Sequence, residues 1–585
     1  MHQIRCEIDF PLLATLTPAE RLRLSFAAPR AVHVARRPEE VSSLIAAVEA
    51  ASLAGNWCVG FVAHEAAPAF DAALQVRAPG EAPLAWFAEF AAPGAAAASP
   101  RAEGFSLTPW TIDIGHDAYR SAIESIRADI RDGRFYQVNF TARLHSRFSG
   151  DAGSYFRALQ REQPGGYHAF IDAGDWALLS VSPELFFTLH DGHITTQPMK
   201  GTAPRGDTAE ADDRIAWALT HSDKERAENL MIVDLLRNDL SRVAAPRSVE
   251  VAALFALQPL PSVWQMVSTI NAGLRPGVGL LEVFRALFPC GSVTGAPKVE
   301  AMRAIRSLEQ SPRGTYCGAI GYVAPAVDGK LRACFNVGIR SIWIEHARAT
   351  AGVGGGITWD STVDGEWAEM IYKGRYANRA ARDFELLETL LLSGGEYAEL
   401  DAHLARMENS ARHFRFAFDR IALVAALERL ASAHPQGAWR VRLLGERDGH
   451  ARAEAHPLGA LPANPRVRLA DAPVLSADEF LQHKTTRRET YDLHAPPGQA
   501  AFDTLLWNER GELTEFTRAN LVLEIDGRHW TPPASAGLLN GVQRERLLRE
   551  GRLFEKTLLR EDLSRAASIG WINSVRGWVR VGLAD

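Results

Sequence analysis

The chain has 585 residues, of which 47% are hydrophobic and 23% charged, and its formal net charge is −6. This length exceeds what one hydrophobic core usually supports, so we expect at least two domains. The mild negative charge excludes the basic footprint of a nucleic-acid-binding protein, and no apolar run reaches the roughly 18 residues of a membrane span. The five cysteines form no metal-type pairs, and the beginning, MHQIRCEIDF, lacks a basic segment followed by an apolar run. We therefore expect a cytoplasmic protein with small-molecule or protein partners.

The first recognisable boundary is an Ala/Pro-rich stretch, Phe90 to Pro100, which predicts a linker. Apolar residues at helical spacing follow Asp117 and predict a helix that ends near Gly133. The next segment, FYQVNFTARL, alternates as a strand. Gln137 and Asn139 share one face of that strand because successive side chains point to opposite sides.

Two later segments predict helices that each carry a pair of glutamates three positions apart. KERAENLMIVDLL contains Glu225 and Glu228, and GEWAEMIYK contains Glu366 and Glu369. If the two faces meet, the four acids crowd together, which is unfavourable unless a hard cation such as Mg²⁺ binds. The alternative is that each pair is a solvated helix face.

Three segments rich in glycine or proline, QPMKGTAPRG, FPCGSVTGAPKVEAM and AGVGGGITWD, indicate places where the backbone can approach a ligand closely. Gly354, Gly355 and Gly356 can present backbone N–H groups to a carboxylate. Arg340 in FNVGIRS and Tyr322 in CGAIGYV add a guanidinium and a hydroxyl. Each segment on its own is equally compatible with a turn.

Nine segments between roughly residues 115 and 376 together resemble the chorismate-utilising enzymes. In order along the chain they are YQVNFT, SPELFF, PMKGTAPRG, AENLMIVDLLRNDL, GSVTGAPK, GAIGY, NVGIR, GGGITWDS and EWAE. This family includes anthranilate synthase, isochorismate synthase and aminodeoxychorismate synthase component I. The resemblance implies an α+β domain with an antiparallel two-sheet core wrapped by helices. It also implies Mg²⁺ at Glu228 and Glu369 with Glu225 and Glu366 close behind, and chorismate carboxylates bound by these residues: Tyr322, Arg340, Gly354, Gly355 and Gly356.

Two positions choose among the reactions of this family. Water-adding members typically have a lysine where this chain has Gln137, and a neutral amide cannot act as that base. Lys200 in PMKGT matches the lysine of aminodeoxychorismate synthases, where anthranilate synthases carry alanine. A lysine amine can attack the ring as the 4-hydroxyl leaves, before ammonia takes its place. Glu184 in SPELFF resembles the general acid for that hydroxyl.

One position departs from the family pattern. Gln265 in SVWQMVS stands where a histidine linked to pyruvate loss often occurs, so we expect aminodeoxychorismate to leave this domain intact. The sequence also lacks a glutaminase nucleophile motif of the GxCxG type. Free ammonia or a separate glutamine amidotransferase subunit must then supply the nitrogen.

A composition change after YKGRYANRAARD places a boundary near Arg382, which gives an N-terminal domain of residues 1–381 and a C-terminal domain of residues 382–585. FELLETLLLSGGEYAEL predicts strand, turn and strand. DAHLARMENSARHF predicts a helix with Leu404, Met407 and Ala411 on one side and Arg406 nearby.

The C-terminal half holds the residue types that a pyridoxal-phosphate site requires. These are a lysine for the cofactor aldehyde, an acid for the pyridine nitrogen, and an arginine with a helix start for the phosphate. Four segments resemble fold-type IV pyridoxal-phosphate enzymes over about residues 384 to 582, namely FLQHKTTRRETY, LTEFTRANLVL, GLLNGVQRERLL and INSVRGWV. The resemblance implies a smaller two-lobed α/β domain, a homodimer through it, and this cofactor set: Lys484 on the aldehyde, Glu515 on the ring nitrogen, and Arg406, Val542, Gln543 and Ser574 on the phosphate.

Fusion of the two halves favours a lyase that converts aminodeoxychorismate to 4-aminobenzoate, a folate precursor. Lys484 would take the C4 proton while enolpyruvate leaves, and formation of the aromatic ring makes that step downhill. One alternative keeps the aminase and makes the C-terminal half a branched-chain or D-amino-acid transaminase. The alternative from another class is a regulatory scaffold with decayed sites, which the intact Lys200, Lys484 and Glu515 disfavour.

Overall fold

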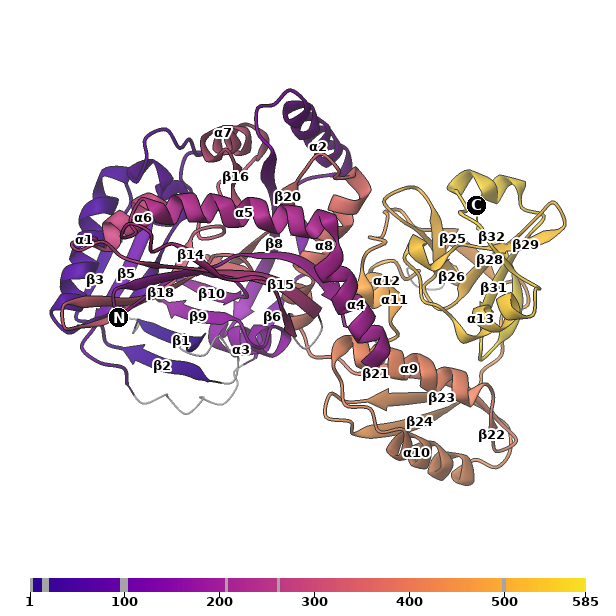
Figure 1. Cartoon of the computed structure of the whole chain (residues 1–585). Helices are drawn as coiled ribbons and strands as arrows, with labels where there is room; N and C mark the ends of the chain where they lie inside the picture. Colours follow the sequence, from indigo (N-terminus) through magenta and orange to yellow (C-terminus); the bar gives the residue numbers. More distant parts are fainter. Residues whose placement is uncertain are drawn as a thin grey trace. The chain divides into compact units, whose positions relative to one another are not determined.

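The computed structural model describes residues 4–12, 20–94, 104–205, 209–259, 263–496 and 501–584. The chain divides into two compact units, Met1–Arg382 and Asp383–Asp585 (Figure 1). The expected linker falls mostly outside the described residues, since Phe90 ends a strand and residues 95–103 are not described. Within the described ranges, every helix is too short or too polar to cross a membrane.

Unit 1 contains two 10-stranded sheets within the described residues, and their strand pairs are antiparallel. The first sheet is built from β1 (Arg5–Pro11), β2 (Arg21–Ala27), β6 (Phe105–Leu107), β7 (Thr111–Ile112), β8 (Gln137–Gly150), β9 (Tyr167–Asp172), β10 (Trp176–Ser182), β16 (Gly295–Ala296), β19 (Ser341–Glu345) and β20 (Arg348–Ile357). Its order is β16-β8-β20-β19-β10-β9-β1-β2, and β6 and β7 pair with β8.

The second sheet is built from β3 (Ala31–Ala35), β4 (Trp57–Val62), β5 (Ala85–Phe90), β11 (Leu185–His190), β12 (His193–Gln197), β13 (Met199–Pro204), β14 (Glu250–Pro259), β15 (Val263–Gly273), β17 (Ala319–Val327) and β18 (Lys330–Val337). Its order is β13-β15-β12-β11-β18-β17-β4-β5-β3, and β14 pairs with β15. Alternate residues of β1 and β9 from one sheet pack with those of β4 and β17 from the other in a shared apolar core. Such alternation is what two facing sheets require.

Helices cover the sheets of unit 1 (Figure 1). They are α1 (Pro38–Leu53), α2 (His116–Arg131), α3 (Ala152–Glu162), α4 (Ala209–His221), α5 (Asp223–Ser241), α6 (Leu280–Leu287), α7 (Lys298–Leu308) and α8 (Val363–Ala380), with short turns η1 (His64–Ala69) and η2 (Gly291–Val293). The helix predicted after Asp117 is confirmed as α2, which buries Tyr119, Ile123 and Ile126. α8 packs against β20, and α5 packs against β13 and β15. Both glutamate-bearing helices therefore reach strands that carry predicted site residues.

Unit 2 has two lobes. The first joins β21 (Leu386–Ser393), β22 (Glu396–Tyr397), β23 (Ala438–Gly445) and β24 (Ala451–Pro457) to α9 (Leu400–Phe414) and α10 (Arg420–Ala433). The predicted strand, turn and strand are confirmed as β21 and β22. The predicted apolar side of α9 is also confirmed, since Leu404, Met407 and Ala411 are buried together.

The second lobe is an 8-stranded sheet of order β27-β26-β25-β32-β31-β28-β29-β30. Its elements are β25 (Arg466–Leu469), α11 (Glu479–Gln482), α12 (Glu489–Leu493), β26 (Asp503–Trp507), β27 (Leu513–Phe516), β28 (Asn520–Ile525), β29 (Arg528–Thr531), η3 (Ala534–Ala536), α13 (Val542–Arg549), β30 (Phe554–Glu555), η4 (Arg560–Arg565), β31 (Ser568–Asn573) and β32 (Gly577–Leu583). β25 runs parallel to β26 and β32. The predicted fold class, an antiparallel two-sheet α+β unit followed by a two-lobed α/β unit, is confirmed.

Candidate functional site

Lys200 lies at the start of β13, and its amine reaches the glycine segment of β20. A Cβ built on Gly356 would lie 2.1 Å from Gln137 Nε2 and 3.2 Å from Lys200 Nζ. A side chain at residue 356 would therefore displace both groups. Gln137, on β8, is 1% exposed, and it approaches Gly356 from the neighbouring strand of the same sheet.

Glu184, just before β11, is buried close to the Lys200 amine. Burial raises the pKa of its carboxyl to about 7, and the Ser292 hydroxyl and the Lys200 charge only partly offset that rise. Such a carboxyl carries a proton for part of the time at neutral pH. Among the described residues, Glu184 Oε1 and Gln137 Oε1 are buried without a hydrogen-bond partner. Unsatisfied buried polar atoms are costly, so a polar ligand at this place would stabilise the site.

The predicted glutamates come together around Gly355 and Gly201. A Cβ on Gly355 would lie 3.4 Å from Glu366 Oε2 and 3.7 Å from Glu369 Oε1, and a Cβ on Gly201 would lie 3.0 Å from Glu225 Oε2. Gly355 and Gly356 are consecutive residues of β20, and the Lys200 charge acts on both Glu225 and Glu369, so the acids and the amine lie close to one another.

Charge crowding is visible in the pKa values of these acids. Burial and then the neighbouring Glu228 raise the pKa of Glu225. Burial is also the main reason that the pKa of Glu366 is raised, with Glu369 adding to it. Burial works in the same direction on Glu369, but the ammonium of Lys373, 2.7 Å away, outweighs it and the pKa of Glu369 is lowered. Glu228 lies 4.0 Å from the amine of Lys224.

This acidic cluster fits a cation that keeps part of its water. The donors are carboxylate oxygens, as Mg²⁺ prefers. Within the described ranges, the residues that bring three possible ligand atoms within 4.8 Å of one another are Glu81, Glu345 and His346. The four predicted glutamates do not reach that spacing. The cluster is thus more open than a closed cage of protein ligands.

Lys373 was missed by the sequence analysis. Its amine donates to the Gly354 carbonyl oxygen at 3.1 Å and pairs with Glu369 at 2.7 Å. It stands one helical turn after Glu369 in EWAEMIYK, so the i, i+4 spacing was a usable signal.

Two further predicted substrate-binding residues, Arg340 and Gly354, lie in different backbone settings. Arg340 lies between β18 and β19 with a φ of 48°, a strained conformation, and its guanidinium donates to Gln163 Oε1. Gly354 is required by close strand pairing, because a Cβ there would lie 2.2 Å from the Phe140 carbonyl oxygen. Among the described residues, pairing of β19 with β20 stops at Ala351, so one edge of the glycine segment is not paired to β19.

Tyr322 requires a correction. Its ring packs in the core between the two sheets, with ring centroids 5.6 Å from Phe10 and 5.9 Å from Trp57. Burial raises the pKa of its hydroxyl. This core contains none of the other predicted site residues. The Tyr322 side chain therefore belongs to the interior between the two sheets and does not bind a substrate carboxylate.

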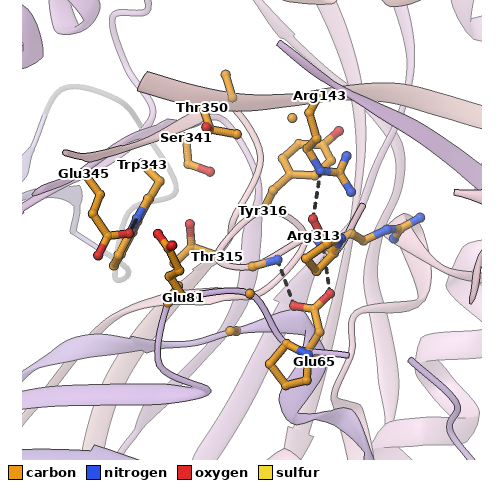
Figure 2. Close-up of a pocket in the computed structure, with 18 of the residues that line it drawn as sticks. Glu65, Glu81, Arg143, Arg313, Thr315, Tyr316, Ser341, Trp343, Glu345 and Thr350 are labelled. Atoms are coloured by element: carbon orange, nitrogen blue, oxygen red, sulfur yellow. Dashed lines mark hydrogen bonds between the residues drawn. The ribbon is translucent and has the colours of Figure 1, made fainter. Parts of the chain in front are cut away.

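A separate hollow of about 120 Å³ in unit 1 is lined by other residues (Figure 2). Glu65 accepts hydrogen bonds from the backbone N–H groups of Arg313 at 2.7 Å and Gly314 at 2.8 Å. The guanidinium groups of Arg143 and Arg313 are paired with buried Glu309. These three charged side chains thus have partners within the protein, and none of the predicted site residues lines this hollow.

In unit 2, Lys484 follows α11, and its backbone carbonyl accepts from the Leu387 N–H at 3.0 Å. Burial lowers the pKa of its amine to about 7, and the positive charges of Arg488 and Arg406 lower it further. With such a pKa, about half of the amine is unprotonated at neutral pH and can act as a nucleophile.

Glu515 on β27 is 3% exposed and is held by three donors. Tyr491 Oη donates at 2.8 Å, the Leu539 N–H at 3.0 Å and Asn520 Nδ2 at 3.2 Å. Burial raises its pKa to about 7, and these hydrogen bonds and the Lys484 charge partly offset the rise. The two ionisable groups predicted for one cofactor therefore influence each other directly.

Arg406 projects from α9 and is fixed by a buried acid. Its Nε lies 2.8 Å from Glu388 Oε1 and its second terminal nitrogen 2.7 Å from Glu388 Oε2, while His403 Nδ1 lies 2.7 Å from the same carboxylate. The pKa of Glu388 falls to about 2 because the attraction of Arg406 and His403 outweighs burial. Arg406 also donates to the Asn540 carbonyl at 3.1 Å, close to the start of α13.

Val542 and Gln543 are the first residues of α13, whose N-terminal N–H groups are the type of donor that binds phosphate. Gln543 Oε1 accepts from Arg546 at 2.9 Å, so its side chain has another partner. Ser574 lies in the turn between β31 and β32, where Asn573 Oδ1 accepts from the Val575 and Arg576 N–H groups. Among the described residues, no hydrogen bond or ion pair joins Ser574 to the other predicted phosphate ligands.

Residues 91–378 match the family of chorismate binding enzymes, and residues 385–583 match the class IV amino-transferases. Most of unit 1 is therefore similar to the chorismate binding enzymes, and nearly all of unit 2 is similar to the class IV amino-transferases. Aminodeoxychorismate synthase component 1 of Salmonella typhimurium is 41% identical over 276 residues, which are 47% of this chain and 60% of that protein.

Anthranilate synthase component 1 of Aquifex aeolicus is 34% identical over 271 residues, covering 46% of this chain and 54% of that protein. The chain thus spans only about 60% or less of the length of these relatives. Anthranilate synthase component I of Streptococcus pneumoniae has a similar fold, with a TM-score of 0.50 at 24% identity over 64% of this chain and 90% of that one.

Proposed function

We propose that unit 1 converts chorismate and ammonia to 4-amino-4-deoxychorismate, and that unit 2 eliminates pyruvate from this product to give 4-aminobenzoate for folate biosynthesis. The observation that carries the proposal is the convergence of Lys200 Nζ and Gln137 on Gly356 beside buried Glu184. A nucleophilic amine and a protonated carboxyl then share one small space, as displacement of a hydroxyl by nitrogen requires.

In the proposed amination, the Lys200 nitrogen bonds to the ring of chorismate while Glu184 gives its proton to the departing 4-hydroxyl, which leaves as water. Ammonia then forms the new C–N bond at C4 and the bond to Lys200 breaks. Gln137 cannot remove a proton from water, which disfavours the hydrating reaction. Mg²⁺, when bound, neutralises a substrate carboxylate. Glu228 and Glu369 would hold it, with Glu225 and Glu366 close behind and Arg340 and the glycine segment on the substrate.

Pyridoxal phosphate fits the residues of unit 2 and, when bound, supplies an electron sink. Lys484 would bond to its aldehyde, Glu515 would face its ring nitrogen, and Arg406 with the start of α13, at Val542 and Gln543, would face its phosphate. Ser574 is retained as a predicted phosphate ligand. Once free of the aldehyde, the Lys484 amine would take the C4 proton, and the ring becomes aromatic as pyruvate is released.

The full chain incubated with chorismate, Mg²⁺, pyridoxal phosphate and ammonium should form fluorescent 4-aminobenzoate. Absence of both aminodeoxychorismate and 4-aminobenzoate with ammonium present would contradict the proposed function.

Two partners are part of the proposal. Replacing ammonium by glutamine should require an added glutamine amidotransferase subunit. A homodimer through unit 2 is the second, and sedimentation measures it directly.

A class IV amino-transferase match also favours a second candidate, in which unit 2 is a branched-chain or D-amino-acid transaminase. Amination of an α-keto acid by the purified chain, with no conversion of added aminodeoxychorismate, would select this candidate. If pyridoxal phosphate added to the protein produces no visible absorbance band, unit 2 is instead a scaffold with a decayed site.

Amination should fall as the pH rises above neutrality. Glu184 must carry a proton in order to donate it, and its pKa is raised to about 7 by burial. The protonated fraction is therefore nearly complete at about pH 6, and it declines about tenfold per pH unit above about pH 8. The measurement is kcat/KM for chorismate at a fixed concentration of neutral ammonia. Glu184→Gln should remove this alkaline limb along with most of the activity; an unchanged limb in that variant would assign it to another group.

Removal of Mg²⁺ by a chelator should stop amination and leave conversion of added aminodeoxychorismate intact. Glu228→Gln should raise the Mg²⁺ concentration needed for half-maximal amination by at least about 10-fold, since it removes one ligand. Glu81→Gln is the matched control, because Glu81 is an exposed acid of unit 1 that is grouped with Glu345 and His346 instead of with the four glutamates. Equal Mg²⁺ requirements of the two variants would argue against a metal at the glutamate cluster.

A further inference from the structure

Gln265 lies opposite the segment that carries Lys200. β13 and β15 pair through Met199 with Val267 and through Thr202 with Gln265. Three steps along β13 therefore match two along β15, which defines a bulge that contains Lys200 and Gly201. Bulges leave a residue without its ladder partner and change the direction of a side chain. The direction of Lys200 thus depends on how this bulge is held.

The side-chain amide of Gln265 contacts two neighbouring residues of this segment, Gly201 in the bulge and Thr202 just after it. Its Nε2 donates to the Gly201 carbonyl oxygen at 2.8 Å, and its Oε1 accepts from Thr202 Oγ1 at 2.8 Å. A backbone carbonyl can only accept, so the orientation of the amide follows from Gly201. Gln265 is 7% exposed, and this shielding strengthens the bond to Gly201.

Gly201 leaves little freedom for another arrangement. Its φ of 88° is unfavourable for residues with a side chain, and a Cβ there would lie 3.0 Å from Glu225 Oε2. The bulge is therefore bounded by Glu225 on one side and by the Gln265 amide on the other. Movement of Gly201 would carry the preceding Lys200 with it.

We infer that Gln265 is a positioning residue, which holds the β13 bulge through Gly201 and Thr202 and so directs the Lys200 amine at Gly356. This inference rests on the proposed function for its catalytic consequence, but its geometric part is independent of that function. It gives Gln265 a role of its own, beyond the lack of an imidazole at this position.

The chemistry of the side chain explains why an amide suits this role. The donor and acceptor of glutamine sit on one carbon and reach two neighbouring groups. The two nitrogens of histidine diverge around a ring, so one imidazole cannot serve Gly201 and Thr202 together. Glutamate would turn an acceptor towards the Gly201 carbonyl, and methionine would leave that carbonyl without a donor.

The test compares Gln265→Met with Gln258→Met in the full chain. Gln258 is the matched control because it pairs directly with Gln265 on the neighbouring strand β14. Lysines are labelled briefly with acetic anhydride, and Lys200 is quantified by peptide mass spectrometry against exposed Lys330. Release of the bulge should raise labelling of Lys200 about fivefold in Gln265→Met, as expected for loss of one buried hydrogen bond, and should not change it in Gln258→Met.

The kinetic arm measures amination by the same variants. Gln265→Met should lower kcat about 10²-fold, because small displacements of a reacting group are costly, while KM for chorismate changes by less than about threefold. If circular dichroism shows that Gln265→Met does not fold, Gln265→Glu takes its place with the same expectation.

Unchanged labelling of Lys200 in the Gln265 variant overturns the inference, whatever the activity. A loss of activity that appears in KM alone also overturns it. If labelling of Lys200 rises while the unmodified chain does not aminate chorismate, the positioning role stands and the proposed function fails.

Discussion

Lys200→Ala should abolish formation of aminodeoxychorismate from chorismate, with a loss on the order of 10⁴-fold or more, because the proposed displacement needs a covalent nucleophile. The variant should still convert added aminodeoxychorismate to 4-aminobenzoate at the unmodified rate. The measurement is product formation by chromatography, with ammonium as the nitrogen donor and with each substrate supplied in turn.

Lys330→Ala is the control for this experiment, since Lys330 is an exposed lysine of the same unit. Loss of both activities in Lys200→Ala would contradict the independence of the two sites. Near-normal amination would show that ammonia attacks the ring without help from this amine, and the covalent step would have to be abandoned.

Lys484→Ala should produce the opposite pattern. Chorismate should be aminated at the unmodified rate, and aminodeoxychorismate should accumulate, because the amine that would bind the cofactor and take the C4 proton is gone. We expect release of 4-aminobenzoate to fall on the order of 10⁴-fold. The visible absorbance of the protein with pyridoxal phosphate should disappear in the same variant, which provides a readout independent of turnover.

A matched control for unit 2 is Lys556→Ala, since Lys556 is exposed and its ammonium faces the Trp530 ring. If Lys484→Ala retains both the absorbance band and the release of 4-aminobenzoate, the lyase assignment is wrong. If the band is lost but no aminodeoxychorismate accumulates, the failure lies in unit 1 instead.

Much of the fold followed from periodicity. The spacing of Tyr119, Ile123 and Ile126 predicted α2, and the glutamate pairs were correctly placed on helices that became α5 and α8. Local patterns succeed here because an amphipathic helix must bury one face wherever it packs. The pairing of strands β8 and β20, which brings Gln137 and Gly356 together, was not predicted, since register is a long-range property.

Individual side-chain directions were harder to predict. Tyr322 stands in a motif that suggested a ligand, but strand alternation points its ring into the core between the sheets. Lys373 was overlooked although its helical spacing from Glu369 was visible. The hydrogen bond from Gln265 to the Gly201 carbonyl depends on a one-residue bulge, and the local composition does not predict such a bulge.

In unit 2 the residue types were predicted more reliably than their partners. Glu515 and Lys484, both predicted to hold one cofactor, are close enough for the charge of each to act on the other. Glu388 on β21, which fixes Arg406 from 18 residues earlier in the chain, was not anticipated, because an ion pair between two elements has no signature within either one.

The two glycines of β20 have a consequence for the space around the charged groups. A Cβ on Gly355 would meet the Lys373 ammonium and the carboxylates of Glu366 and Glu369, whereas one on Gly356 would meet Gln137 and the Lys200 amine. Among the described residues, the Lys200 amine forms no ion pair, although its charge acts on Glu225 and Glu369. Both glycines thus keep free the space between the strand and these charged groups, and a substitution at either one would fill it.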